Sequence, residues 1–246
     1  MRPYLSYDLQ HYDVPMTSQK DLKTALATIK QLIAEYELKY AREPGCVQLL
    51  AVSKTQAAER VLEAFQCGQH AFAENYLQEA LGKQASLVGC AIEWHFIGPI
   101  QSNKTRDIAA NFDWVHSVDR LKIAQRLSEQ RPPERGPLNV LIQVNLSEED
   151  SKSGVAVGEV AALAAAMAPL PGIRLCGLMA IPAPASSLEA QRPVFRQLAL
   201  LRDQLLALGH AHCRHLSMGM SADFEAAIAE GATYVRIGTD IFGARG

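Results

Sequence analysis

Residues 47–66, VQLLAVSKTQAAERVLEAFQ, contain the pattern that decides the fold of this chain. The apolar run over residues 47–52 has the length of a buried strand. A longer amphipathic stretch over residues 57–66 follows it, with the spacing of a helix. The polar triplet Ser53-Lys54-Thr55 comes directly after the apolar run. The segment therefore predicts one strand followed by one helix.

The same order of strand and helix recurs along the chain. Further strands are expected over residues 70–73, 93–97, 113–117, 138–144, 173–180, 212–216 and 233–237. Helices are expected from about residue 75 and over residues 102–110, 119–130, 156–168, 188–208 and 223–229, and an additional one over residues 22–36 precedes the first strand. Strands separated by helices of this length pair in parallel through right-handed crossovers.

Eight such units favour a closed barrel. An open, doubly wound parallel sheet is the alternative that the same alternation allows. The chain has 246 residues, and α/β barrels of about 200–250 residues form one domain. We therefore expect a single α/β domain over residues 1–246. It is a (β/α)8 TIM-type barrel with an extra N-terminal helix, in which residues 1–16 form an irregular extension.

The composition is typical of a globular protein with a sizeable core, since 48% of the residues are hydrophobic and 20% are charged. The net charge of −2 gives no reason to expect nucleic acid or an anionic membrane as a partner, although a local basic patch is compatible with it. No apolar run reaches the roughly 18 residues of a membrane span. Residues 1–16 also lack the apolar core of a signal peptide.

The five cysteines are widely spaced and form no C-x-x-C pair. This argues against a disulfide framework or a structural zinc site and indicates a reducing compartment. We therefore expect a cytoplasmic protein. The spacing of His210, His212 and His215 would also suit a metal site, but we expect none.

Functional groups of a (β/α)8 barrel follow the carboxyl ends of the strands, and Lys54 follows the first predicted strand. A lysine that emerges into solvent is one interpretation. A lysine inside the barrel mouth is the other: partial desolvation favours its neutral amine, a nucleophile that forms Schiff bases with carbonyl compounds.

A phosphate cradle is predicted after the last two strands. Gly238 lets the backbone approach a ligand, and neighbouring N–H groups with the Thr239 hydroxyl can bind a phosphate. Ser217 and Gly219, after the seventh strand, are placed to complete it, because barrels often bind phosphate in these two loops. An ordinary turn, with Arg236 as a surface charge or ion-pair partner, is the alternative.

Three further polar residues have two interpretations each. Asn75 is either a ligand near the barrel mouth or a helix N-cap. His95, on the apolar stretch 94–97, is either a ligand or a core histidine. Lys152, in the loop 151–154, is either a solvated charge or a second, transient cofactor site.

Seven short motifs occur in order: AVSKT (51–55), AENY (73–76), WHFIGPIQSNK (94–104), SKSG (151–154), GLMA (177–180), LSMGMS (216–221) and YVRIGTDIFG (234–243). Together they resemble the motifs of the YggS/PROSC family at compatible spacing. The likeness runs from about residue 49 to residue 246, and residues 1–45 share with the family only a leading helix. It implies a pyridoxal 5′-phosphate (PLP) homeostasis protein whose barrel is similar to the N-terminal domain of alanine racemases.

By this resemblance, Lys54 carries PLP as a Schiff base. The other residues that the resemblance implies contact three parts of the cofactor: the phosphate (Ser217, Gly238 and Thr239), the pyridine nitrogen (Arg236) and the ring (Asn75, with His95 as a neighbour).

The same resemblance bears on activity. An arginine at the pyridine nitrogen stays cationic and cannot donate a full proton, so the cofactor is a poorer electron sink than one paired with a carboxylate. Alanine racemases also use a tyrosine from a C-terminal β domain, and this chain ends at Gly246. We therefore expect a monomeric carrier that buffers PLP, hands it to apoenzymes and lacks strong catalytic activity.

Two alternatives stay open. One is a weak PLP-dependent amino-acid racemase or lyase. The other is a barrel that binds a different phosphorylated metabolite without covalent chemistry.

Overall fold

A computed structural model describes residues 16–146 and 153–243. Its strands are β1 (Gln48–Val52), β2 (Ala71–Glu74), β3 (Glu93–Phe96), β4 (Trp114–Val118), β5 (Leu138–Asn145), β6 (Val155–Ala156), β7 (Ile173–Met179), β8 (His215–Ser217) and β9 (Tyr234–Ile237). Eight of them form one closed parallel ring, while the short β6 pairs only with β5. The ring closes where β1 pairs with β9, from Gln48 opposite Tyr234 to Ala51 opposite Ile237. The predicted barrel is confirmed, and the open sheet is excluded.

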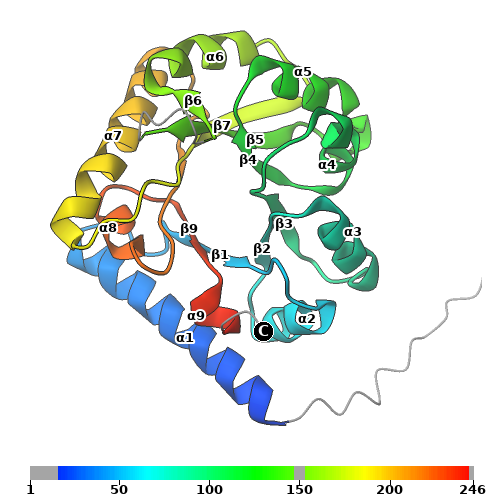
Figure 1. The fold of residues 1–246 in the computed structure, drawn as a ribbon, viewed down its shortest axis with the longest axis vertical. Helices are drawn as coiled ribbons and strands as arrows, with labels where there is room; N and C mark the ends of the chain where they lie inside the picture. Colours follow the sequence, from blue (N-terminus) through cyan, green and yellow to red (C-terminus); the bar gives the residue numbers. More distant parts are fainter. Residues whose placement is uncertain (1–15, 147–152, 244–246) are drawn as a thin grey trace, which may run out of the picture.

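Helices cover the outside of the strand ring (Figure 1). They are α1 (Met16–Lys39), α2 (Ala58–Gln66), α3 (Leu77–Ser86), α4 (Thr105–Asn111), α5 (Leu121–Gln130), α6 (Val160–Met167), α7 (Leu188–Ala207), α8 (Phe224–Ala229) and α9 (Thr239–Phe242), with 3-10 turns at Ser102–Lys104, Pro133–Arg135 and Val157–Glu159. The extra helix α1 packs against α2, α8 and α9, beside the place where the ring closes.

Several predicted boundaries differ from the structure by a few residues. Helix α3 begins at residue 77 instead of about 75, and α4 begins at residue 105 instead of 102, after a 3-10 turn. The N-terminal helix already begins at Met16, which was expected to belong to an irregular extension; residues 1–15 lie outside the described part. The seventh strand is β8 at residues 215–217 instead of 212–216, because the N–H groups of Cys213 and Arg214 bond within a turn, to His210 O and His212 O. Helix α6 begins at residue 160, after β6 and a 3-10 turn, instead of at residue 156.

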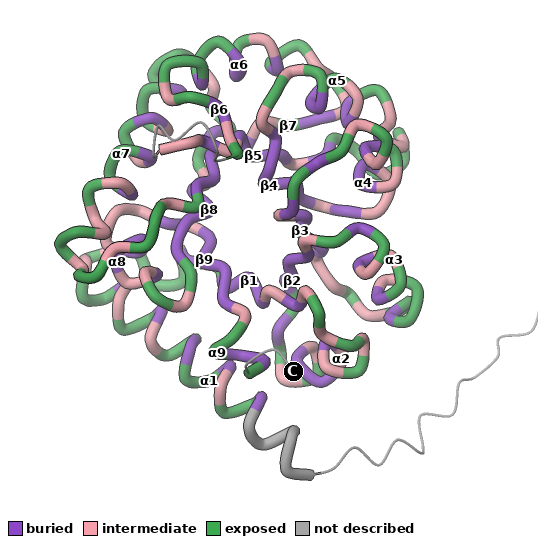
Figure 2. The backbone as a smooth tube through the Cα atoms, in the orientation of Figure 1, coloured by how far each residue is buried: buried purple, intermediate pink, exposed green. Residues whose placement is uncertain are grey.

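Strand residues alternate between two hydrophobic layers, since successive side chains of a strand point to opposite faces. Leu49 and Ala51 belong to the layer between strands and helices, whereas Leu50 belongs to the layer inside the barrel. The same parity places Val235 outside and Tyr234 inside. Figure 2 shows that most strand residues are buried, whereas the helices are buried on one side.

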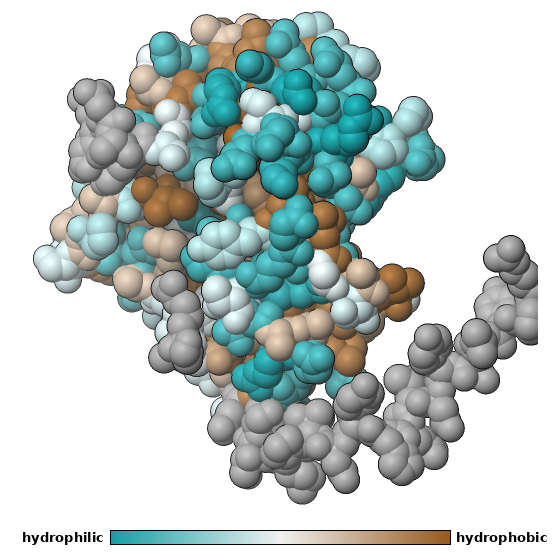
Figure 3. Space-filling model, turned by 45° about the vertical axis from the view of Figure 1, so that its right-hand side comes forward, coloured by the Kyte–Doolittle hydropathy of each residue, from teal (hydrophilic) through white to brown (hydrophobic). Residues whose placement is uncertain are grey.

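The face of the molecule in Figure 3 is mostly polar. Hydrophilic residues dominate the face in Figure 3, and hydrophobic ones occur there in separate patches. Over residues 16–146 and 153–243, no helix combines the length and the apolar character that crossing a membrane requires.

Candidate functional site

A buried arginine lies on the last strand of the barrel. Arg236 is only 3% exposed, and it donates from Nη1 to Ser217 Oγ (2.7 Å) and from Nη2 to the Ala180 carbonyl oxygen (3.0 Å). Burial lowers its pKa from 12.5 to about 10, and the negative charge of Asp223 opposes this shift. The guanidinium therefore stays cationic at neutral pH, and it is not the surface charge that the sequence allowed.

Both of these partners are neutral oxygens, and the guanidinium has five N–H donors. A buried cation is costly unless it is paired and hydrogen-bonded. Arg236 therefore has donors and charge to offer to an acceptor at the carboxyl end of the barrel.

Ser217 lies inside the barrel beneath this arginine. Its side chain is fully buried, and its Oγ contacts His116 Nδ1 (2.8 Å) as well as Arg236. His116 Nε2 in turn lies 2.9 Å from His95 Nδ1. The hydroxyl therefore has two partners within the barrel. The contact of Ser217 with a phosphate stays a prediction.

The loop that carries Lys54 begins where β1 ends. Lys54 is partly buried, whereas Ser53 is fully buried. Thr55 has a φ of 65°, a left-handed conformation that is costly for a β-branched residue and persists only where its surroundings impose it. The backbone on both sides of Lys54 is therefore held in one conformation.

A buried cluster of charges imposes it. Lys83, 5% exposed on α3, donates to the Ser53 carbonyl oxygen (2.6 Å), to Glu74 Oε1 (2.7 Å) and to Glu79. Glu74 Oε1 also accepts from Ser53 Oγ (2.6 Å), and Glu79 Oε1 accepts from the Thr55 N–H (2.6 Å). Burial raises the pKa of Glu74, against the hydrogen bonds from Lys83 and Ser53 that lower it.

Asn75 follows β2 at the same end of the barrel. Its Oδ1 is buried and has no hydrogen-bond partner among the described residues. The N-cap of α3 is Tyr76, so the alternative that Asn75 caps this helix is wrong. The loop after β3 comes very close, because a Cβ on Gly98 would lie 2.0 Å from the Asn75 carbonyl oxygen.

The loops after β8 and β9 meet near the end of β1. Gly219 has a φ of 91°, a Cβ there would lie 2.6 Å from Ala227 Cβ, and its carbonyl oxygen accepts from the Arg236 N–H (3.0 Å). A Cβ on Gly238 would lie 3.2 Å from the Val52 carbonyl oxygen. Thr239, exposed, begins α9. Glycine backbone is thus packed closely between Arg236 and the strand that leads to Lys54.

The structure also shows two positions that sequence reasoning did not single out. His116 lies inside the barrel beside Ser217, and Lys83 lies beneath the Lys54 loop. A sequence signal exists for the first, because His95, His116, Ser217 and Arg236 all belong to predicted strands or their ends. The helix position of Lys83 carries no such signal.

The histidines near residue 212 have different surroundings. His215 packs on the rings of Trp114 and Tyr234, whereas His212 is exposed in the preceding turn. In the two described ranges, no group of three or more His, Cys, Asp or Glu side chains could hold a metal ion. Lys152 lies outside these ranges.

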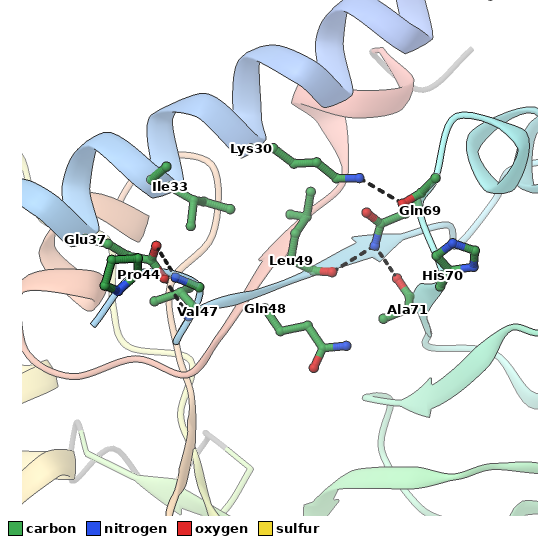
Figure 4. Close-up of a pocket in the computed structure, with 13 residues that line it drawn as sticks. Lys30, Ile33, Glu37, Pro44, Val47, Gln48, Leu49, Gln69, His70 and Ala71 are labelled. Carbon is green, nitrogen blue, oxygen red and sulfur yellow. Dashed lines mark hydrogen bonds between the residues drawn. The ribbon is translucent and has the colours of Figure 1, made fainter. Parts of the chain in front are cut away.

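A pocket of about 440 Å³ lies between α1 and the amino ends of β1 and β2, away from these loops (Figure 4). Three of its polar side chains bond to backbone atoms: Lys30 donates to Gly68 O, Gln69 donates to Leu49 O and Ala71 O, and Glu37 accepts from Val47 N. These groups are already used in holding the fold.

Comparison with known proteins gives the family. Residues 25–246 match the model of the alanine racemase N-terminal domain. A pyridoxal phosphate homeostasis protein of Pseudomonas aeruginosa is 59% identical over 220 residues, which cover 89% of this chain and 94% of that protein. The chain belongs to the pyridoxal phosphate homeostasis protein family. The resemblance predicted from the seven motifs is thereby confirmed.

Two further relatives agree. The homeostasis protein of Escherichia coli is 51% identical over 230 residues, covering 92% of this chain and 97% of that protein. PipY of Synechococcus elongatus, solved with PLP bound, has 32% sequence identity and a TM-score of 0.79, and the match covers 90% of this chain and all of that one.

Proposed function

We propose that this chain binds PLP as a Schiff base on Lys54 and acts in intracellular PLP homeostasis as a buffer or carrier. The observation that carries the proposal is Arg236, a buried cation with neutral partners at the carboxyl end of the barrel. It lies on β9, which pairs with the strand that leads to Lys54. The names of the relatives and the PLP bound to PipY support the same ligand.

The residues present fit the cofactor. PLP needs an amine for its aldehyde, a partner for its pyridine nitrogen and a cradle for its phosphate. Lys54, Arg236 and the Gly238-Thr239 backbone offer these groups. Asn75 Oδ1, buried without a partner among the described residues, is an acceptor that a bound ring could use.

In the proposed complex, each residue has one task. The Lys54 amine condenses with the PLP aldehyde and releases water. Arg236 donates a hydrogen bond to the pyridine nitrogen, and Ser217 supports Arg236 from inside the barrel. Gly238, Thr239 and the loop around Gly219 bind the phosphate with backbone N–H groups and a hydroxyl. Asn75 adjoins the ring, with His95 buried further inside.

The state of Arg236 favours a carrier over an enzyme. Its pKa of about 10 leaves it protonated at neutral pH, and an arginine does not pass a full proton to the ring. PLP then stabilises carbanions poorly. Imine exchange needs no such stabilisation. A weak amino-acid racemase or lyase activity is the second candidate.

Borohydride reduction followed by mass spectrometry tests the proposed linkage. PLP mixed with the protein should produce the visible absorption of a Schiff base and, after reduction, a single adduct on Lys54. The Lys54→Ala variant should lack both, whereas Lys104→Ala, which changes a lysine of the 3-10 turn before α4, should retain both. If the wild-type protein showed neither the absorption band nor the adduct, the hypothesis that the barrel binds a different phosphorylated metabolite without covalent chemistry would replace the proposed PLP linkage.

A turnover assay separates the carrier from the enzyme. Purified protein is incubated with a panel of L- and D-amino acids, and racemisation and carbonyl products are followed. We expect no sustained turnover. Turnover that the Lys54→Ala variant abolishes would contradict the carrier role.

We also propose a cellular location, an oligomeric state and a class of partner for this protein. A carrier of this kind works as a cytoplasmic monomer that passes PLP to apoenzymes. Sedimentation velocity should give a single species with the 26.9 kDa mass of one chain. To test transfer, the protein with PLP bound is mixed directly with a PLP-dependent apoenzyme. The apoenzyme should then become active.

A further inference from the structure

A continuous line of side chains crosses the barrel interior and ends at Arg236. Arg236 Nη1 lies 2.7 Å from Ser217 Oγ, which lies 2.8 Å from His116 Nδ1. His116 Nε2 lies 2.9 Å from His95 Nδ1. His95 Nε2 lies 3.3 Å from Glu93 Oε1 at the start of β3. Four different strands therefore contribute to one row of polar groups.

The direction of these hydrogen bonds follows from the arginine. A guanidinium can only donate, so Ser217 Oγ accepts from Arg236. Among the described residues, His116 is the other hydrogen-bond partner of this hydroxyl. The hydroxyl proton must therefore go to His116 Nδ1, because a buried donor without an acceptor is costly.

The tautomers of His116 and His95 follow from the direction of this hydrogen bond. A neutral His116 that accepts at Nδ1 carries its proton on Nε2, so it donates to His95 Nδ1. His95 then also carries its proton on Nε2, which faces the carboxylate of Glu93. That last contact is close but lacks hydrogen-bond geometry, and Nε2 has no hydrogen-bond partner among the described residues. It is therefore an electrostatic contact that favours a proton, and not a lone pair, on Nε2.

The surroundings keep both histidines neutral. Each is fully buried, and burial lowers the pKa of each. Trp114, Tyr234 and His215 line the same space, as their ring contacts with the two histidines or with each other show. The charge of Glu93 favours the protonated form of His95, whereas the charge of Arg236 disfavours that of His116.

We propose that His95 and His116 are positioning residues for Arg236, each held as the neutral Nε2-protonated tautomer. In this state Ser217 is a hydrogen-bond acceptor toward Arg236, which fixes the guanidinium plane between Ser217 Oγ and the Ala180 carbonyl oxygen. A proton on His116 Nδ1 would instead leave the Ser217 hydroxyl proton without an acceptor among the described residues. The tautomers belong to the ligand-free protein, and the link to PLP retention rests on the proposed function.

Histidine NMR tests the tautomers directly. Long-range ¹H–¹⁵N correlation spectra of uniformly labelled, PLP-free protein distinguish a proton on Nδ1 from one on Nε2. The spectra of His95→Asn and His116→Asn assign the two rings among the seven histidines. Both rings should be neutral and protonated on Nε2 at neutral pH. A proton on Nδ1 of His116, or a charged ring, would overturn the proposal.

PLP affinity tests the positioning role. His116→Leu removes both contacts and should weaken PLP binding about 2- to 10-fold, the effect of one lost buried hydrogen bond. His116→Asn keeps a polar group near Ser217 Oγ and should restore part of the affinity. His215→Asn, which changes a neighbouring barrel histidine outside the row, should bind PLP like the wild type.

Two further outcomes are decisive. If His116→Leu folds, as its circular dichroism would show, and binds PLP with wild-type affinity, the positioning role is refuted. If His116→Leu does not fold, the Arg236 side-chain ¹⁵N resonances of His116→Asn decide, since a shift from the wild-type position is expected and an unchanged position contradicts the proposal. Wild-type protein that binds no PLP but has the expected tautomers would refute only the proposed function.

Discussion

Lys83 offers a sharp test of how the loop around Lys54 is held. The Lys83→Met substitution keeps the length of the side chain and removes its charge. Glu74, which is fully buried, then loses its cation, while Ser53 O and Glu79 lose a donor. Glu74 Oε2 has no partner among the described residues even in the wild type. The substitution therefore leaves a carboxylate in the interior with one hydroxyl as its donor.

Breaking a buried ion pair by removing one partner costs about 3–5 kcal/mol. For a chain of this length, each kcal/mol lowers the melting temperature by about 2–4 °C, so a decrease of about 6–20 °C is expected. The double variant Lys83→Met/Glu74→Gln removes the stranded charge as well. It should be more stable than Lys83→Met alone, because the two residues act on one network.

Urea denaturation followed by tryptophan fluorescence and circular dichroism measures these differences. Lys30→Met is the matched control, since this exposed lysine makes a single bond to the Gly68 carbonyl oxygen. It should cost far less than Lys83→Met. A Lys83→Met protein within about 1 kcal/mol of the wild type would refute the reasoning, because a surface ion pair is worth that much.

Three further results are expected. Burial holds the pKa of His116 well below 6.5 in the folded state, so only the unfolded state gains its proton below pH 6.5. This one proton lowers the free energy of unfolding by about 1.4 kcal/mol per pH unit there, in addition to the contributions of His95 and His215, whose pKa values burial also lowers. His116→Asn should reduce the slope in urea titrations, whereas His212→Asn, at an exposed position, should not. Gly98→Ala should destabilise the protein by about 1–3 kcal/mol through its contact with Asn75 O, whereas Gly82→Ala, in open space on α3, should stabilise it by about 0.5–1 kcal/mol in thermal unfolding. Arg236→Ala should weaken PLP binding about 10- to 100-fold in equilibrium dialysis and still allow a borohydride-reducible adduct on Lys54; unchanged affinity would contradict its place at the ring.

Much of the fold was predictable because a buried parallel strand is a short apolar run and a covering helix is a longer amphipathic one. The eight runs of this chain are separated well enough to be counted. The start of β8 was predicted three residues too early for a local reason. Residues 212–214 directly precede the strand, but backbone hydrogen bonds to the carbonyl oxygens of residues 210 and 212 form a turn there. Such turns depend on the position of α7, which periodicity does not encode.

The site was predictable only in part. Lys54, Asn75 and Gly238 could be predicted as site residues because each follows a strand, and all parallel strands of a barrel end at one face. The inward or outward direction of a strand side chain depends on register. Ser217 and Arg236 point into the same interior, where Ser217 meets His116, and neither residue type nor spacing reveals that contact.

Lys83 shows a second limit. A lysine on an amphipathic helix ordinarily lies in solvent. Here it is buried because Glu74, at the end of β2, and the Ser53 carbonyl oxygen, after β1, lie beneath α3. The burial of Lys83 therefore depends on the relative positions of three segments: α3, the end of β2 and the loop after β1.

The pairing of β1 with β9 has a consequence for the order of events during synthesis. Lys54 leaves the ribosome well before Arg236 and Gly238, which lie on β9 and directly after it, and domains generally form as units. A nascent chain therefore displays the reactive lysine long before it can retain a cofactor. PLP would then bind only molecules whose barrel has closed. By mass action it would stabilise the pairing of β1 with β9. The supply of PLP and the folding yield of this protein are thereby expected to rise and fall together.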